Sequence, residues 1–269
     1  MDSDNIESLS IIFIATNDYV KLVKNCIRSL ERNNSKNICI TIHILTNLDF
    51  EFNNFLIQNP KFSICMHEID DLKWPYITLL RYHYMNQIKD CIKDSRVMYL
   101  DSDMVFEGDI SELINEKNFM KDFTVVRHPA YSLKNLVRNL GVFSFGLIFS
   151  NTVKAIISRS LAFGDWEDRP ESTAYLTRSM RKKYCHGAIW FGGKNKFFEV
   201  CSELELNTDK DLKNSLIAKW HDESHLNHYA NSHDVQWLES RFSQWKKLSS
   251  RGVIFSVDKD NDKLHSEVK

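Results

Sequence analysis

The sequence predicts an α/β fold whose central sheet begins with parallel strands, and three observations support this. An apolar, β-prone run at residues 9–15 is followed by a helical apolar period at 19–30 and a second apolar run at 38–45, which is the β-α-β order of a parallel sheet. Another apolar run, 97–100, ends in two aspartates, and open α/β sheets place ligands at such strand ends. The length of 269 residues suits one such domain.

The first half of the chain alternates strands with helices. After the first strand, Thr16-Asn17-Asp18 offers turn and helix-capping chemistry, and Trp74-Pro75 interrupts the pattern before a later helix. Up to residue 126 the pattern predicts strands at 9–15, 38–45, 62–69, 97–100 and 123–126, and helices at 19–30, 50–57, 78–92 and 109–113.

The second half begins with a segment, 130–164, whose pattern is harder to interpret. Beyond residue 126 the sequence predicts strands at 142–149 and 186–193, and helices at 153–161, 194–206 and 210–229. A charged tail starts at Leu248 and contains one apolar island, 253–255. With no internal repeat and no clear linker, the economical prediction is one domain at 1–247 followed by a C-terminal extension at 248–269.

Composition narrows the class of protein. A formal net charge of -1 gives no general attraction to nucleic acid. The six cysteines are scattered without a C-x-x-C pair or zinc-ligand spacing, which favours reduced thiols in the cytoplasm. The acidic, polar N-terminus does not resemble a signal peptide, and no apolar run approaches the ~18–20 residues of a membrane span.

The segment Asp101-Ser102-Asp103 is the first candidate site. In an extended segment, residues two apart point to the same side, so both carboxylates can converge on one cation. Hard oxygen ligands suit Mg²⁺ or Mn²⁺, which usually bind one or two carboxylates together with substrate phosphates. The pattern therefore predicts a metal-bridged diphosphate, and an acidic turn after a strand is the alternative.

The octapeptide 220–227, with the sequence WHDESHLN, is the second candidate. His221 and His225 share a helix face at a spacing that also suits zinc, so a metallohydrolase has to be considered. Zinc hydrolases of that type place glutamate directly after the first histidine, whereas here Asp222 takes that position and Glu223 is about 100° further round the helix. Packing of both histidines at a helix start is the more probable interpretation than metal ligation.

Two further segments contain small or titratable residues at strand ends. His128, in Arg127-His128-Pro129, can contact sugar hydroxyls or be a hydrogen-bonded core residue. The small residues of His186-Gly187-Ala188 can make room for a ligand or for close packing against a helix.

Taken together, these motifs resemble glycosyltransferase family 6, which contains the ABO blood-group and α-1,3-galactosyltransferases and their bacterial relatives. The octapeptide matches the family signature letter for letter, and the other matching segments come in the family's order: 74–82, 101–104, 127–129, 169–175 and 184–193. The Asp-x-Asp part alone also resembles glycosyltransferase family 8. The resemblance implies a GT-A-type nucleotide-sugar-binding fold with a mixed, mostly parallel central sheet flanked by helices.

The resemblance also implies roles for single residues. On the donor side, these are uridine and ribose contacts at Ile14, Ala15, Thr16 and Tyr19, a diphosphate-side arginine at Arg81, the metal and diphosphate segment Asp101, Ser102 and Asp103, donor-sugar contacts at His186, Gly187, Ala188 and Asp222, and a tail contact at Lys259. On the acceptor side, they are His128 and Trp190, with Glu223 placed under the anomeric carbon as the catalytic residue that also borders the acceptor.

The activity that the resemblance implies is retaining transfer of galactose or N-acetylgalactosamine from a UDP-sugar to a galactose-ended glycan, including a lipid-linked one, in an α-1,3 linkage. Mn²⁺ or Mg²⁺ is the expected cofactor, because Asp101 and Asp103 are carboxylates where bacterial members often carry Asn-x-Asn. Ala188 favours galactose, although one extra residue near Trp190 shifts the alignment there. A non-catalytic glycan- or nucleotide-binding protein on the same fold, and a zinc hydrolase, are the alternatives.

Two other departures bear on these expectations. Residues 131–163 form an apparent insertion, and the vertebrate membrane anchor has no counterpart. The second departure suggests a soluble bacterial or viral form, located in the cytoplasm or peripheral to the membrane.

Overall fold

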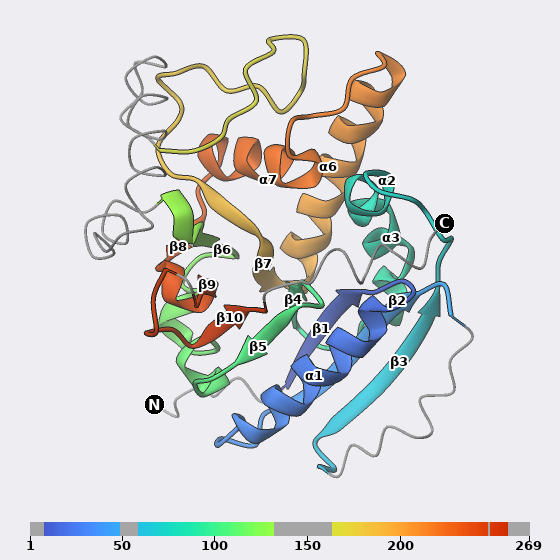
Figure 1. The fold of residues 1–269 in the computed structure, drawn as a ribbon, viewed down its shortest axis with the longest axis vertical. Coiled ribbons are helices and arrows are strands. Elements are labelled where there is room, and N and C mark those ends of the chain that lie inside the picture. Colours follow the sequence, from blue (N-terminus) through green and yellow to red (C-terminus); the bar gives the residue numbers. More distant parts are fainter. Residues whose placement is uncertain (1–7, 49–58, 132–162, 247, 258–269) are drawn as a thin grey trace.

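The computed structural model describes residues 8–48, 59–131, 163–246 and 248–257. Its main sheet has seven strands in the order β3-β2-β1-β4-β7-β6-β8 (Figure 1). In chain order these strands are β1 (Ser8–Ile14), β2 (Cys39–Thr46), β3 (Phe62–Glu68), β4 (Arg96–Leu100), β6 (Phe123–Arg127), β7 (Cys185–Gly193) and β8 (Gln236–Leu238). Strand β7 is antiparallel to both of its neighbours and the other pairs are parallel, which confirms the predicted α/β architecture with a mixed, mostly parallel sheet.

Helices cover both faces of this sheet because the strands alternate apolar side chains between them. In β1, Leu9, Ile11 and Phe13 face α1 (Tyr19–Arg32), whose buried stripe includes Val23 and Ile27. The opposite face is covered by α2 (Tyr76–Leu79), α3 (Arg81–Gln87), α6 (Lys194–Lys213) and α7 (His221–Ser232) (Figure 1). Short 3₁₀ turns lie at Lys89–Cys91, Ile110–Glu112, Glu116–Phe119, Pro129–Tyr131 and Ser240–Phe242.

A second, three-stranded sheet joins distant parts of the chain. It has the order β5-β10-β9, formed by β5 (Met104–Phe106), β9 (Gln244–Trp245) and β10 (Ile254–Ser256). Ile254 and Phe255 are buried, and the Val257 N–H donates to the Asp103 carbonyl at 2.8 Å. The described part of the predicted C-terminal extension is therefore built into the protein body beside the aspartate segment.

Three predicted helices differ from the structure: 78–92, 194–206 and 210–229, the last of which is interrupted between Lys213 and His221. The expected helix at 78–92 is divided into α2, α3 and a 3₁₀ turn, with the first break at Leu80. The expected break near residues 207–209 is wrong, because α6 runs on to Lys213 and ends where Ser215 takes a left-handed backbone conformation with φ 58°. The predicted elements at 50–57, 142–149 and 153–161 lie outside the described residues.

Among the described residues, no helix has both the length and the apolar character needed to cross a membrane.

Candidate active site

A cavity of about 610 Å³ opens at the carboxyl ends of β1 and β4, the edge where open α/β sheets bind ligands. Seven of the predicted donor-side residues line it: Ile14, Thr16, Tyr19, Arg81, Asp101, Ser102 and Asp103. Ala15 does not, because its side chain is buried and its N–H donates to the Leu45 carbonyl at 2.9 Å. The fold therefore brings most of that set to a single cavity.

The two aspartates reach this cavity through a tight turn. The Met104 N–H donates to the Asp101 carbonyl at 3.3 Å, so the assumption of an extended Asp-x-Asp segment was wrong. Asp101 accepts a hydrogen bond from the Tyr99 hydroxyl at 2.6 Å. Asp101 and Asp103 both line the cavity beside Ser102, and such an oxygen-only donor set fits a hard divalent cation.

Arg81 connects the aspartate turn to the octapeptide on α7. Its guanidinium is buried and contacts Asp222 Oδ2 at 2.9 Å and Asp101 Oδ1 at 3.4 Å. It also donates to the Gly187 carbonyl at 3.1 Å and lies over the Tyr99 ring, 4.6 Å from its centre. Because its Nε has no partner among the described residues, this side chain retains one donor.

The two acids of the octapeptide sit in a desolvated environment. Burial raises the pKa of Asp222 to about 7, although Arg81 opposes the shift. Burial also raises the pKa of Glu223 to about 8, against hydrogen bonds from the Gly187 N–H and the Tyr184 hydroxyl. Glu223 is thus largely protonated at neutral pH before any ligand binds. Strongly shifted carboxyls of this kind are typical of functional sites.

The histidines of the octapeptide have separate partners. His221 contacts Thr78 Oγ1 at 3.4 Å and packs edge-on against the Trp74 ring. His225 is buried, 3.5 Å from Thr173 Oγ1 and 3.9 Å from Asp211 Oδ2. These contacts support packing for both rings, and neither belongs to the group of possible metal ligands found among the described residues.

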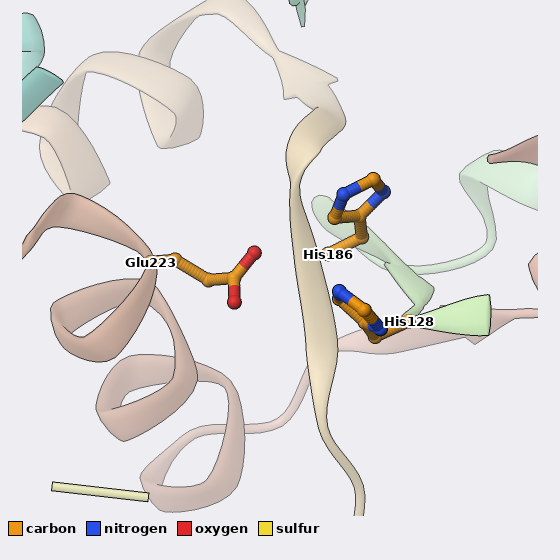
Figure 2. A group of neighbouring side chains, drawn as sticks. All are labelled: His128, His186 and Glu223. Atoms are coloured by element: carbon orange, nitrogen blue, oxygen red, sulfur yellow. The ribbon is translucent and has the colours of Figure 1, made fainter. Parts of the chain in front are cut away.

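That group is His128, His186 and Glu223, whose ligand atoms lie within 4.8 Å of one another. Figure 2 shows the Glu223 side chain extending from α7 towards β7, with the two imidazole rings nearby. His128 Nδ1 accepts the Ala130 N–H at 3.2 Å. Burial, and to a smaller extent the charge of the neighbouring His186, hold the pKa of His128 well below its usual range. The neutral ring therefore presents Nε2–H, a donor suited to a hydroxyl oxygen and not to a metal ion.

Three further predicted residues are not among those that line the cavity. Trp190 has no exposed surface, because it is stacked between Tyr99 and Phe197 in the core, so its indole has no surface with which to contact an acceptor. Ala188 is also a core residue, and Gly187 packs against Glu223. Lys259 lies outside the described residues.

Several cavity residues were not predicted as contacts: Asn17, Asp18, Asp71, Leu72, Lys73, Trp74, Ile77, Thr78 and Tyr99. Trp74, Ile77 and Thr78 belong to a motif that carried the family resemblance, so a signal for them existed. The loop 71–73 follows β3 without any motif, and only the folded arrangement brings it to the cavity.

Comparisons with known proteins bear on the family of the chain. The glycosyltransferase family 6 model matches residues 135–252. WbnI of Escherichia coli, an O-antigen biosynthesis glycosyltransferase, is 25% identical over 266 residues, which are 97% of this chain and 99% of that protein. Glycosyltransferase GlyB of Streptococcus pneumoniae is 28% identical over 117 residues, covering 39% of this chain and 28% of that protein. The family match contains β7 and α7, and the similarity to WbnI extends over the aspartate turn, so both comparisons support the resemblance to glycosyltransferase family 6.

Proposed function

We propose that this glycosyltransferase moves galactose or N-acetylgalactosamine from a UDP-sugar to a galactose-ended glycan, with retention and an α-1,3 linkage. The observation that carries the proposal is the position of Arg81, whose guanidinium contacts Asp101 at the cavity and Asp222 beside Glu223. A leaving diphosphate near the aspartate turn and a sugar near Glu223 would then be adjacent.

The charges beside the aspartate turn support the proposed diphosphate site. Asp101 and Asp103 would hold Mn²⁺ or Mg²⁺, and a bound cation would offset the negative charge that develops on the leaving diphosphate. Arg81 supplies a permanent positive charge at the same place, since a guanidinium does not lose its proton in proteins. Being buried, it interacts with that charge in a medium of low dielectric constant.

The sugar end is supported by the acids of α7. Asp222 would accept hydrogen bonds from donor-sugar hydroxyls. Glu223, in its ionised form, would stabilise the oxocarbenium-like transition state or attack the anomeric carbon on the face opposite the leaving group. The fixed Nε2–H of His128 would donate to a hydroxyl oxygen of the acceptor.

A non-catalytic glycan- or nucleotide-binding protein on the same fold is the second candidate. The cavity and its charges would serve binding equally well, so turnover separates the two functions. Tight binding of a UDP-sugar by the wild-type protein, without UDP release in the presence of any galactose-ended acceptor, would support that second function.

The test is a donor screen that measures UDP release with UDP-galactose and UDP-N-acetylgalactosamine, with Mn²⁺ or with EDTA. We expect release that depends on acceptor and metal, and an α-1,3 linkage in the product by NMR. Asp101→Asn or Asp103→Asn should lower the rate by ~100–1000-fold. Asp234→Asn, at a carboxylate that is 85% exposed, is the matched control and should leave the rate unchanged. Full transfer in EDTA, or by the Asp101→Asn/Asp103→Asn double variant, contradicts the proposed role of the metal.

A further inference from the structure

Helix α7 faces the start of β7 with three polar side chains, each one helical turn after the last: Glu223, Asn227 and Asn231. Asn231 Oδ1 accepts the N–H groups of Lys182 at 3.0 Å and Lys183 at 3.2 Å. Its Nδ2 donates to the Lys183 carbonyl at 2.9 Å. This side-chain amide therefore pairs with the backbone as a neighbouring strand would.

Asn227 repeats the arrangement one turn earlier. Its Oδ1 accepts the Cys185 N–H at 2.8 Å, and its Nδ2 donates to the Cys185 carbonyl at 3.0 Å. The same Nδ2 donates to the Glu223 carbonyl at 2.9 Å. Asn227 thus fixes both the strand and the backbone of Glu223.

The spacing of helix and strand explains why the pairing repeats. Four helical residues advance about 6.0 Å, and two strand residues advance about 6.6 Å. On the other side of the strand, the His128 N–H donates to the Tyr184 carbonyl at 2.9 Å, so Lys183 and Cys185 turn their polar groups towards α7.

Glu223 occupies the third step of this series. Its Oε2 accepts the Gly187 N–H at 2.8 Å, but a carboxylate has no N–H to donate to the Gly187 carbonyl, and Arg81 supplies that donor. The approach is close, because a Cβ on Gly187 would lie 3.2 Å from the Cβ of Glu223. Glu223 therefore approaches the strand as Asn227 and Asn231 do, but its side chain is an acid.

We propose that Asn227 is a positioning residue for sugar transfer, which sets the place of the Glu223 carboxylate by holding α7 in register with β7. The inference rests on the proposed function. Asn231, which makes the same kind of pairing two turns from Glu223, holds the helix without placing the carboxylate. The chain therefore contains its own matched control.

The test compares Asn227→Ala with Asn231→Ala in the full-length protein. Both lose strand hydrogen bonds of the same kind, together with one hydrogen bond to the carbonyl four residues earlier, so thermal unfolding should show similar decreases in Tm. Asn227→Ala should lower kcat by about 10–100-fold with little change in donor KM, because small misplacement of a catalytic group is costly. Asn231→Ala should keep the wild-type kcat. Equal losses of kcat in the two variants, or none in Asn227→Ala, would overturn the inference.

A second readout does not depend on turnover. Carboxyl NMR titration of Glu223 should show a higher pKa in Asn227→Ala than in wild type, because the Gly187 N–H that favours the charged form is no longer held against it, and no change in Asn231→Ala. The ionisable groups around this carboxyl are Asp222, Arg81, Tyr131, Tyr184, Cys185, His128 and His186. Should the wild-type protein transfer no sugar, the proposed function fails, and an unshifted titration in Asn227→Ala would sink the positioning role separately.

If Asn227→Ala does not fold, Asn227→Ser and Asn231→Ser form a second matched pair. Serine removes the side-chain amide at either position, keeps a hydroxyl there and adds no charge. The same difference in kcat between the two sites is expected, and its absence would contradict the inference.

Discussion

Glu223 is an acid at a position where the surrounding structure suits a neutral side chain. It precedes two asparagines on the same face of α7, accepts a backbone N–H as they do, and has its pKa raised to about 8 mainly by burial. Ionising a carboxyl there costs stability, and under the proposed function its presence is explained by chemistry that requires the charge. Stability and sugar transfer should therefore place opposite demands on this side chain.

Replacing Glu223 by glutamine should stabilise the protein and abolish transfer. In wild type the folded pKa of about 8 exceeds the ordinary value of 4.5, so the folded state binds more protons and its free energy of unfolding falls as pH rises from about 4.5 to 8. Glutamine does not titrate, so its advantage should grow across that window. Urea unfolding at several pH values measures it. Glu199→Gln, at a side chain that is 64% exposed, is the control, and a pH-independent difference for Glu223→Gln would contradict the account.

Individual residues also show how far the sequence predicts the site. Asp101, Asp103 and Arg81 all line one cavity, and the signals that singled them out, a strand end and the order of the motifs, are local; their roles stay predictions. Trp190 was misplaced, because a fully apolar strand does not reveal which of its residues face the core. The contact between Arg81 and Asp222 depends on tertiary packing, which no local pattern contains.

At the scale of elements, strands were predicted better than helix ends. Runs such as 38–45 are apolar on both faces, as buried parallel strands must be. Helix α6 continues past residue 207 because Asp211 is buried there, accepting hydrogen bonds from the Ser172 hydroxyl at 2.5 Å and the Thr173 N–H at 2.8 Å. Sequence alone shows an acid in that position and gives no sign of its distant partners.

This contact between α6 and the loop before β7 leads to a prediction about stability. Ser172→Ala removes a buried hydrogen bond to Asp211 and should lower the free energy of unfolding by about 1–3 kcal/mol. The cavity is not involved, so donor KM should stay the same. Thr177→Ala, whose hydroxyl lies 3.1 Å from the Ser179 hydroxyl at an exposed site, is the control and should cost much less in the same urea titration. Similar losses in the two variants would show that the Asp211 contact is not stabilising.

At the scale of the whole molecule, the C-terminal segment connects the aspartate turn to the rest of the protein through strand pairing. Strand β10 pairs with β5 directly after Asp103, and the Val257 N–H bonds to the Asp103 carbonyl. The predicted division at residue 247 therefore does not separate a structural core from an accessory tail within the described residues. Apolar content identified the island at 253–255, but its partner strand could not be read from the sequence.

Two shortened chains separate the role of β10 from the role of the residues after Val257. A chain ending at Gly252 lacks Val253, Ile254 and Phe255, each 3% exposed or less. At about 1.5–3 kcal/mol for each side chain, their loss is comparable with the entire stability of many proteins, so this chain should not fold cooperatively. A chain ending at Val257 keeps β10 and should show a wild-type circular dichroism spectrum and Tm. If Lys259 contacts the diphosphate, that same chain and full-length Lys259→Ala should both raise the KM for the UDP-sugar, with Lys263→Ala as the control. An unchanged donor KM in both would remove Lys259 from the donor site while leaving the fold as described.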